Sequence, residues 1–141
     1  MIHLVTGGSG SGKSAYAEQC ILDFGGTRRV YIATMQPFGA EGQARIARHR
    51  KMRAAKKFST IECYTNLKEV ELEPGSDVLL ECMSNLTANE IFDPSGAGKA
   101  RTEEEILAGV SRLAHQARNL VLVTNEIFSD GYRYEEETME Y

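Results

Sequence analysis

The sequence lacks the features that mark membrane proteins, disulfide-rich secreted proteins and nucleic-acid-binding proteins. No apolar run approaches the roughly 20 residues that a membrane-spanning helix needs, so we expect no membrane span. The three cysteines are odd in number and lack C-x-x-C spacing, which disfavours a disulfide framework and a zinc site. A formal net charge of −4 provides no basic field for nucleic acid. Since no signal peptide precedes the first predicted strand, these absences together indicate a cytoplasmic protein.

The sequence does contain a glycine-rich phosphate-binding pattern near its start. Residues 7–14 match G-x-x-x-x-G-K-[ST] and lie between a run that suits a buried strand (residues 1–6) and one that suits a helix. Glycines let successive backbone N–H groups turn toward an anion, and the helix start adds a positive dipole end. Lys13 would reach the β- and γ-phosphates, and the Ser14 hydroxyl would ligate Mg²⁺. The pattern predicts a nucleoside triphosphate site that consists of Gly7, Gly8, Ser9, Gly10, Ser11, Gly12, Lys13 and Ser14.

The rest of the sequence alternates strand-like and helix-like segments, which predicts an α/β fold with a mostly parallel sheet flanked by helices. At 141 residues, 42% of them hydrophobic, the chain suits one domain that spans residues 1–141. Strands are expected at residues 2–6, 29–34, 60–63, 77–82 and 120–124, and helices at 13–24, 41–55, 66–70, 83–92 and 102–117. Residues 37–42 are expected to form a loop, and Thr102 with Glu105 a capping box. Because such a sheet would normally continue beyond the acidic residues 135–141, we expect a C-terminal helix and strand to be lacking.

Carboxylates that follow two predicted strands are candidates for the metal side of a nucleotide site. Glu81 follows the apolar residues 78–80, and Glu126 comes soon after the strand expected at residues 120–124. P-loop proteins use an acid at the end of a buried strand to hold Mg²⁺. The sequence therefore predicts that Ser14 and Glu81 bind the metal, with Glu126 as the competing candidate.

A basic segment is the second distinctive feature. Residues 45–57 contain seven lysines and arginines and no acid. Arg45, His49 and Arg53 are four residues apart, so they share one face of a helix, and this indicates that an anion neutralises the face. A solvated charged face is the alternative. Because neighbouring cations lower the pKa of an imidazole, and a neutral imidazole can attack phosphorus, His49 is a candidate catalytic nucleophile.

Five segments, in this order, resemble those of one enzyme family. They are Leu-Val-Thr-Gly-Gly-x-x-Ser-Gly-Lys-Ser at 4–14, Tyr-Ile-Ala-Thr at 31–34, Ala-Arg-Ile-x-x-His at 44–49, Leu-Leu-Glu-Cys at 79–82 with Asn85, and Leu-Val-Thr-Asn-Glu at 122–126. Together they resemble the bifunctional adenosylcobinamide kinase/adenosylcobinamide-phosphate guanylyltransferases of cobalamin nucleotide-loop assembly.

The resemblance implies an activity and a set of residues. Members phosphorylate the aminopropanol hydroxyl of adenosylcobinamide with ATP or GTP, and then transfer GMP from GTP to that phosphate, giving adenosylcobinamide-GDP. His49 matches the histidine that attacks the α-phosphate of GTP and carries GMP. Members assemble as trimers with a site between subunits. Further nucleotide contacts are implied at Ala33, Thr34, Met35, Arg50, Lys51, Met52, Arg53, Glu62 and Glu81.

The sequence also departs from the family pattern. Met52 and Ala54 stand where a glycine and a proline are usual, and residues 127–134 replace a Gly-x-Gly-Ile-Val-Pro loop. Two alternatives therefore stay open. One is a small-molecule P-loop kinase in which the basic helix clamps phosphate, and the other is a degenerate GTP-binding module without turnover.

Overall fold

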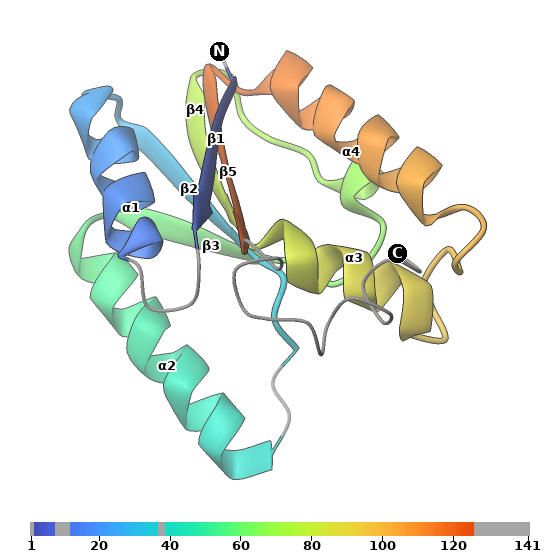
Figure 1. Ribbon diagram of the computed structural model, residues 1–141. Helices are drawn as coiled ribbons and strands as arrows, with labels where there is room; N and C mark the ends of the chain where they lie inside the picture. Colours follow the sequence, from blue (N-terminus) through green and yellow to red (C-terminus); the bar gives the residue numbers. More distant parts are fainter. Residues whose placement is uncertain (1, 8–11, 37–38, 126–141) are drawn as a thin grey trace.

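The computed structural model describes residues 2–7, 12–36 and 39–125, which form three layers (Figure 1). A five-stranded parallel sheet in the order β1-β5-β4-β2-β3 has helices on both faces, which confirms the predicted α/β, P-loop-like fold. The strands are β1 (Ile2–Gly7), β2 (Arg28–Ala33), β3 (Phe58–Glu62), β4 (Ser76–Glu81) and β5 (Asn119–Asn125). The helices are α1 (Lys13–Asp23), α2 (Gly39–Ala55), the short 3₁₀ helix η1 (Leu67–Glu69), α3 (Met83–Phe92) and α4 (Thr102–Gln116). The prediction that a C-terminal helix and strand are lacking concerns residues 126–141 and what would follow them, and these residues lie outside the described part of the chain.

Alternate side chains of the central strands pack into two separate apolar clusters, one on each face of the sheet. Val78 and Leu80 of β4 point toward the face covered by α3 and α4, whereas Leu79 between them points toward α1. Because β4 is covered on both faces, its apolar run is continuous rather than alternating. Figure 1 shows α1 and α2 on one side of the sheet and α3 and α4 on the other.

The first strand is less buried than the sequence predicted. In the described sheet β1 pairs with β5 alone, so it lies at an edge. Val5 packs against the α1 face and the His3 ring lies 5.3 Å from that of Phe24, but Ile2 and Leu4 are 52% and 64% exposed. A strand at an edge receives cover from fewer neighbours, and the apolar sequence alone does not reveal its place in the sheet.

Two elements begin two residues earlier than predicted, whereas the other predicted boundaries are within one residue of those observed. Helix α2 begins at Gly39, so part of the expected 37–42 loop is helical. Strand β3 begins at Phe58 rather than at residue 60, because the buried Phe58 ring packs in the same cluster as Tyr31 and Leu79. Lys57 just before it has a left-handed φ of 65°, which turns the chain sharply out of α2.

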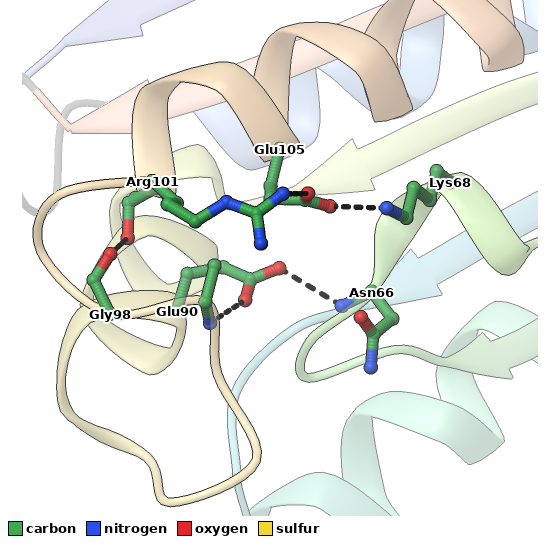
Figure 2. A network of polar contacts seen from close by, with 8 residues as sticks. Asn66, Lys68, Glu90, Gly98, Arg101 and Glu105 are labelled. Carbon is green, nitrogen blue, oxygen red and sulfur yellow. Dashed lines mark hydrogen bonds and ion pairs between the residues drawn. The ribbon is translucent and has the colours of Figure 1, made fainter.

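The predicted capping box at the start of α4 is wrong. Thr102 is already helical, and its hydroxyl donates to the Gly98 carbonyl at 2.7 Å instead of capping the helix. The Glu105 carboxylate accepts from Lys68 at 2.8 Å and from Arg101 at 3.3 Å (Figure 2). Thr102 therefore bonds to a local carbonyl and Glu105 to Arg101 and the distant Lys68, so neither side chain forms the pairing that their spacing suggests.

A buried carboxylate ties two loops together on the same side of the molecule. Glu90 of α3 is 2% exposed and accepts hydrogen bonds from the backbone N–H groups of Asn66 and Ala97, each at 2.9 Å (Figure 2). The loop before η1 and the loop after α3 are thus held by one side chain. Each of these part-buried N–H groups depends on this acceptor, because a donor that loses its partner away from solvent is costly.

We expect Glu90→Ala to lower the free energy of unfolding by about 3 kcal/mol, since it leaves two part-buried N–H groups without their acceptor. Glu90→Gln keeps one carbonyl acceptor and should lose about half as much. Urea unfolding measures both changes. The exposed Glu103→Ala on α4 is the control, and a Glu90→Ala protein as stable as this control would contradict the role given to the carboxylate.

Candidate nucleotide-binding site

The predicted phosphate loop joins the carboxyl end of β1 to the N-terminus of α1. β1 ends at Gly7 and α1 begins at Lys13, with Gly12 in a left-handed conformation at φ 83° that favours glycine. Lys13 is half-buried and Ser14 is exposed in the first turn of the helix. Gly8, Ser9, Gly10 and Ser11 lie outside the described residues. The ends of this loop therefore have the strand-to-helix geometry that binds phosphate through backbone N–H groups.

Sheet register brings three predicted site residues into one row at the carboxyl ends of the strands. Ala33 of β2 pairs with Glu62 of β3 on one side and with Glu81 of β4 on the other. Residues paired in this way point to the same face, here the face of α1 and α2. Glu62 and Glu81 are two strand spacings apart, about 10 Å, with the small Ala33 between them.

The Ser14 hydroxyl donates to Oε2 of Glu81 at 3.0 Å, which links the first turn of α1 to the end of β4. The other carboxylate oxygen, Oε1, is buried and has no hydrogen-bond partner among the described residues. A hydroxyl beside a carboxylate with a spare oxygen offers the hard oxygen ligands that Mg²⁺ prefers. Within the described part of the chain, no three histidine, cysteine or acidic side chains gather as a metal cluster. A cation here would therefore take its remaining ligands from the nucleotide and from water.

Thr34, which follows Ala33 at the end of β2, is fully buried, and its hydroxyl forms hydrogen bonds within the protein. Its hydroxyl lies 2.9 Å from the Cys82 carbonyl and accepts from the Cys82 N–H, also at 2.9 Å. Asn89 of α3 donates to the Thr34 carbonyl at 2.7 Å. These bonds fix the end of β2 against the end of β4, and so hold Glu81 in place. Met35 follows and is half-buried.

Tyr31, which the sequence analysis did not assign to the site, lies beneath the row. Its hydroxyl donates to Oε2 of Glu81 at 3.4 Å, and burial, reinforced by Glu81, raises the pKa of this phenol well above its ordinary value. The guanidinium of Arg53 lies 3.5 Å from the centre of the Tyr31 ring, a cation–π contact. Arg53 is only 6% exposed, so this cation of the basic segment packs into the sheet.

The basic helix is only partly a solvated face. Arg50 forms an ion pair with Glu62, and this pair borders an open pocket of about 420 Å³ lined by Arg50, Phe58, Thr60 and Glu62. Lys56, just beyond the end of α2, pairs with Glu18 of α1 at 2.7 Å. Lys51 is exposed. His49 and Met52 belong to α2, but their side chains lie outside the described part of the structure, as does all of Glu126.

The structure thus gathers Lys13, Ser14, Ala33, Glu62 and Glu81 at one edge of the sheet, with Arg50 beside Glu62. It places the side chains of Thr34 and Arg53 inside the protein instead of on the open surface. Of the described helices, none has the length and apolar character required to cross a bilayer.

A parallel sheet whose first strand leads into a Lys-Ser helix start, with a strand-end carboxylate bonded to that serine, defines a P-loop nucleotide-binding protein. The sequence model of one family, described as cobinamide kinase / cobinamide phosphate guanyltransferase, matches residues 3–141. The chain belongs to this family, as the resemblance predicted.

Two curated relatives support this assignment. Each is named "Bifunctional adenosylcobalamin biosynthesis protein CobU", one from Escherichia coli (strain K12) and one from Salmonella typhimurium (strain LT2). Each is 35% identical over 140 residues, an alignment that covers 90% of this chain and 76% of the relative.

Proposed function

We propose that the protein phosphorylates adenosylcobinamide with ATP or GTP, and then transfers GMP from GTP to adenosylcobinamide phosphate through a guanylylated His49. The product is adenosylcobinamide-GDP, and the enzyme is a transferase that acts in cobalamin nucleotide-loop assembly. The observation that carries the proposal is the Ser14–Glu81 contact, which joins the phosphate-binding helix to the edge of the sheet that also carries the Arg50–Glu62 pair.

In the kinase step, the aminopropanol hydroxyl of adenosylcobinamide attacks the γ-phosphorus of ATP or GTP. The bond between the γ-phosphorus and the bridging oxygen breaks, the nucleoside diphosphate leaves, and the hydroxyl loses its proton. The Lys13 ammonium, at the start of α1, would stabilise the charge that develops on the phosphoryl oxygens. The backbone N–H groups of residues 7–14 would hold the triphosphate in position.

In the transferase steps, a neutral His49 imidazole attacks the α-phosphorus of GTP and pyrophosphate leaves, which produces a phosphoramidate. A phosphate oxygen of adenosylcobinamide phosphate then attacks the same phosphorus, the P–N bond breaks, and the imidazole is restored. Arg50 and Lys51, which directly follow His49 in α2, would balance charge on the α-phosphate. Glu62 would fix the Arg50 guanidinium through their ion pair.

We propose that Ser14 and Glu81 hold Mg²⁺ together with the nucleotide phosphates. The unpartnered Oε1 of Glu81 and the Ser14 hydroxyl suit the ion, which when bound neutralises phosphate charge. Three further parts of the proposal rest on the family resemblance and on the substrates. The chain acts as one nucleotide-binding domain, assembles as a homotrimer with a site between subunits, and works in the cytoplasm, where ATP and GTP are supplied.

The proposal is tested by supplying adenosylcobinamide with ATP, GTP and Mg²⁺ and separating the products by mass. We expect cobinamide to gain one phosphoryl group and then one GMP. With GTP alone, the protein should gain one GMP through a bond that acid breaks and base does not, as a phosphoramidate requires. A protein that binds GTP but changes neither cobinamide nor itself would support the degenerate module instead. Phosphorylation without any GMP transfer would support the plain kinase.

A further inference from the structure

Tyr31 lies between helix α2, which carries His49, and the Glu81 carboxylate at the end of β4. Its ring is the platform for Arg53, in the last turn of α2, and its hydroxyl bonds to Glu81 at the end of β4. Glu81 in turn accepts from Ser14 in the first turn of α1. One side chain, 7% exposed, is therefore in contact with the helix that carries His49 and with the carboxylate beside the phosphate-binding helix.

The apolar packing of Tyr31 does not account for its hydroxyl. The ring belongs to a cluster with Phe58, Leu79 and Ile21, in which a phenylalanine would fill the same space. A buried tyrosine hydroxyl needs a polar partner, and here the partner is one oxygen of Glu81. Since that oxygen accepts from both Tyr31 and Ser14, the carboxylate is held from two sides. Its other oxygen, Oε1, has no hydrogen-bond partner among the described residues.

The ring has a separate role on its other side. Arg53 is one helical turn after His49, and its guanidinium rests on the Tyr31 face while its buried Nε has no hydrogen-bond partner among the described residues. Among the described residues, the ring of Tyr31 is therefore a direct contact of this guanidinium, whereas its Nε forms no hydrogen bond there. The ring contact anchors the C-terminal part of α2 to the sheet, and with it the position of the preceding turn.

We propose that Tyr31 is a positioning residue with two separable roles: its hydroxyl orients Glu81 toward a divalent cation, and its ring fixes α2 for guanylyl transfer. The proposal rests on the proposed function, because it takes His49 as the guanylylated residue. It predicts that the hydroxyl and the ring can be disabled one at a time, with different consequences.

Tyr31→Phe removes the hydroxyl and keeps the platform. We expect the affinity for Mn²⁺, measured by electron paramagnetic resonance with a non-hydrolysable GTP analogue, to fall about tenfold, the effect of one hydrogen bond to a charged acceptor. The rate of GMP adduct formation at saturating Mg²⁺ should stay at the wild-type value. Tyr16→Phe, at an exposed tyrosine of α1, is the matched control and should change neither quantity.

Arg53→Met keeps an unbranched side chain and removes the cation from the ring. Here we expect the reverse, with unchanged Mn²⁺ affinity and an adduct rate lowered about tenfold at saturating Mg²⁺ and GTP, because a small displacement of a reacting group slows the chemical step. Tyr31→Leu, which lacks both hydroxyl and ring, should show both defects. Urea unfolding of every variant separates these effects from loss of fold.

Two results would overturn the inference. One is a Tyr31→Phe protein with wild-type Mn²⁺ affinity, and the other is a pair of single variants with the same pattern of defects. If the wild-type protein itself forms no GMP adduct, the proposed transferase function fails, whereas the Mn²⁺ measurement on Tyr31→Phe still decides the role of the hydroxyl. The two failures are therefore distinguishable.

Discussion

His49→Ala is expected to abolish the covalent GMP adduct and leave ATP-dependent phosphorylation of cobinamide close to wild type. The nucleophile disappears, but the phosphate-binding end of α1 and the Ser14–Glu81 contact do not depend on it. Incubation with α-labelled GTP and Mg²⁺, followed by intact-protein mass measurement, reads out the adduct. Phosphorylation is followed separately by the mass of cobinamide.

The matched control for His49 is its neighbour on the same helix. Arg48 is exposed, so Arg48→Ala removes a cation from α2 without touching the proposed nucleophile, and we expect it to keep the adduct. A His49→Ala protein that is still labelled through an acid-labile bond would place the nucleophile on another residue. Loss of both activities in His49→Ala would favour a role in binding triphosphate over a covalent one.

Lys13→Ala is expected to lower phosphoryl transfer about 10²- to 10³-fold, the usual effect of removing one charged group that stabilises a transition state. GMP transfer should fall as well if the same end of α1 holds the triphosphate of GTP. Steady-state rates with ATP and with GTP, measured separately, give both values. Lys13→Arg keeps the charge with a different shape and should recover only part of the rate.

The exposed Lys99 provides the control for loss of a lysine. Lys99→Ala should leave the kinase rate close to wild type, because it lies in the turn before α4, which covers the face of the sheet opposite α1 (Figure 1). Unchanged phosphorylation in Lys13→Ala would contradict the phosphate-binding role of the first helix. A fall confined to phosphorylation would show that the two reactions use different triphosphate positions.

Much of the fold could be predicted because local patterns and the global architecture agree. Apolar runs such as residues 78–80 and 120–123 predict central strands, and they occupy the middle of the sheet. The exposed position of Ile2 and Leu4 could not be predicted, since strand order is a property of the whole sheet. The capping box failed for a related reason, because distant partners such as Lys68 compete for Glu105.

The candidate site could be predicted where a motif dictates the chemistry, as at Lys13 and Ser14. The partnership between Ser14 and Glu81 also follows from the rule that strand-end acids accompany a P-loop, and the 3.0 Å contact agrees with it. Tyr31 could not be found in this way. In sequence it is one more aromatic residue in a β-rich run, and its importance comes from Arg53, 22 positions later, and Glu81, 50 positions later.

The sparse cover of β1 has a consequence for how ligand and stability are coupled. The strand that leads into the phosphate loop carries Ile2 and Leu4, among the most exposed large apolar side chains of the described residues. Local opening events begin where few contacts must be broken, so amide protons of this strand should be the first of the sheet to exchange with solvent. A ligand that binds the closed form suppresses such openings by mass action. Nucleotide binding would therefore slow amide exchange in β1 more than in the central strands of the sheet.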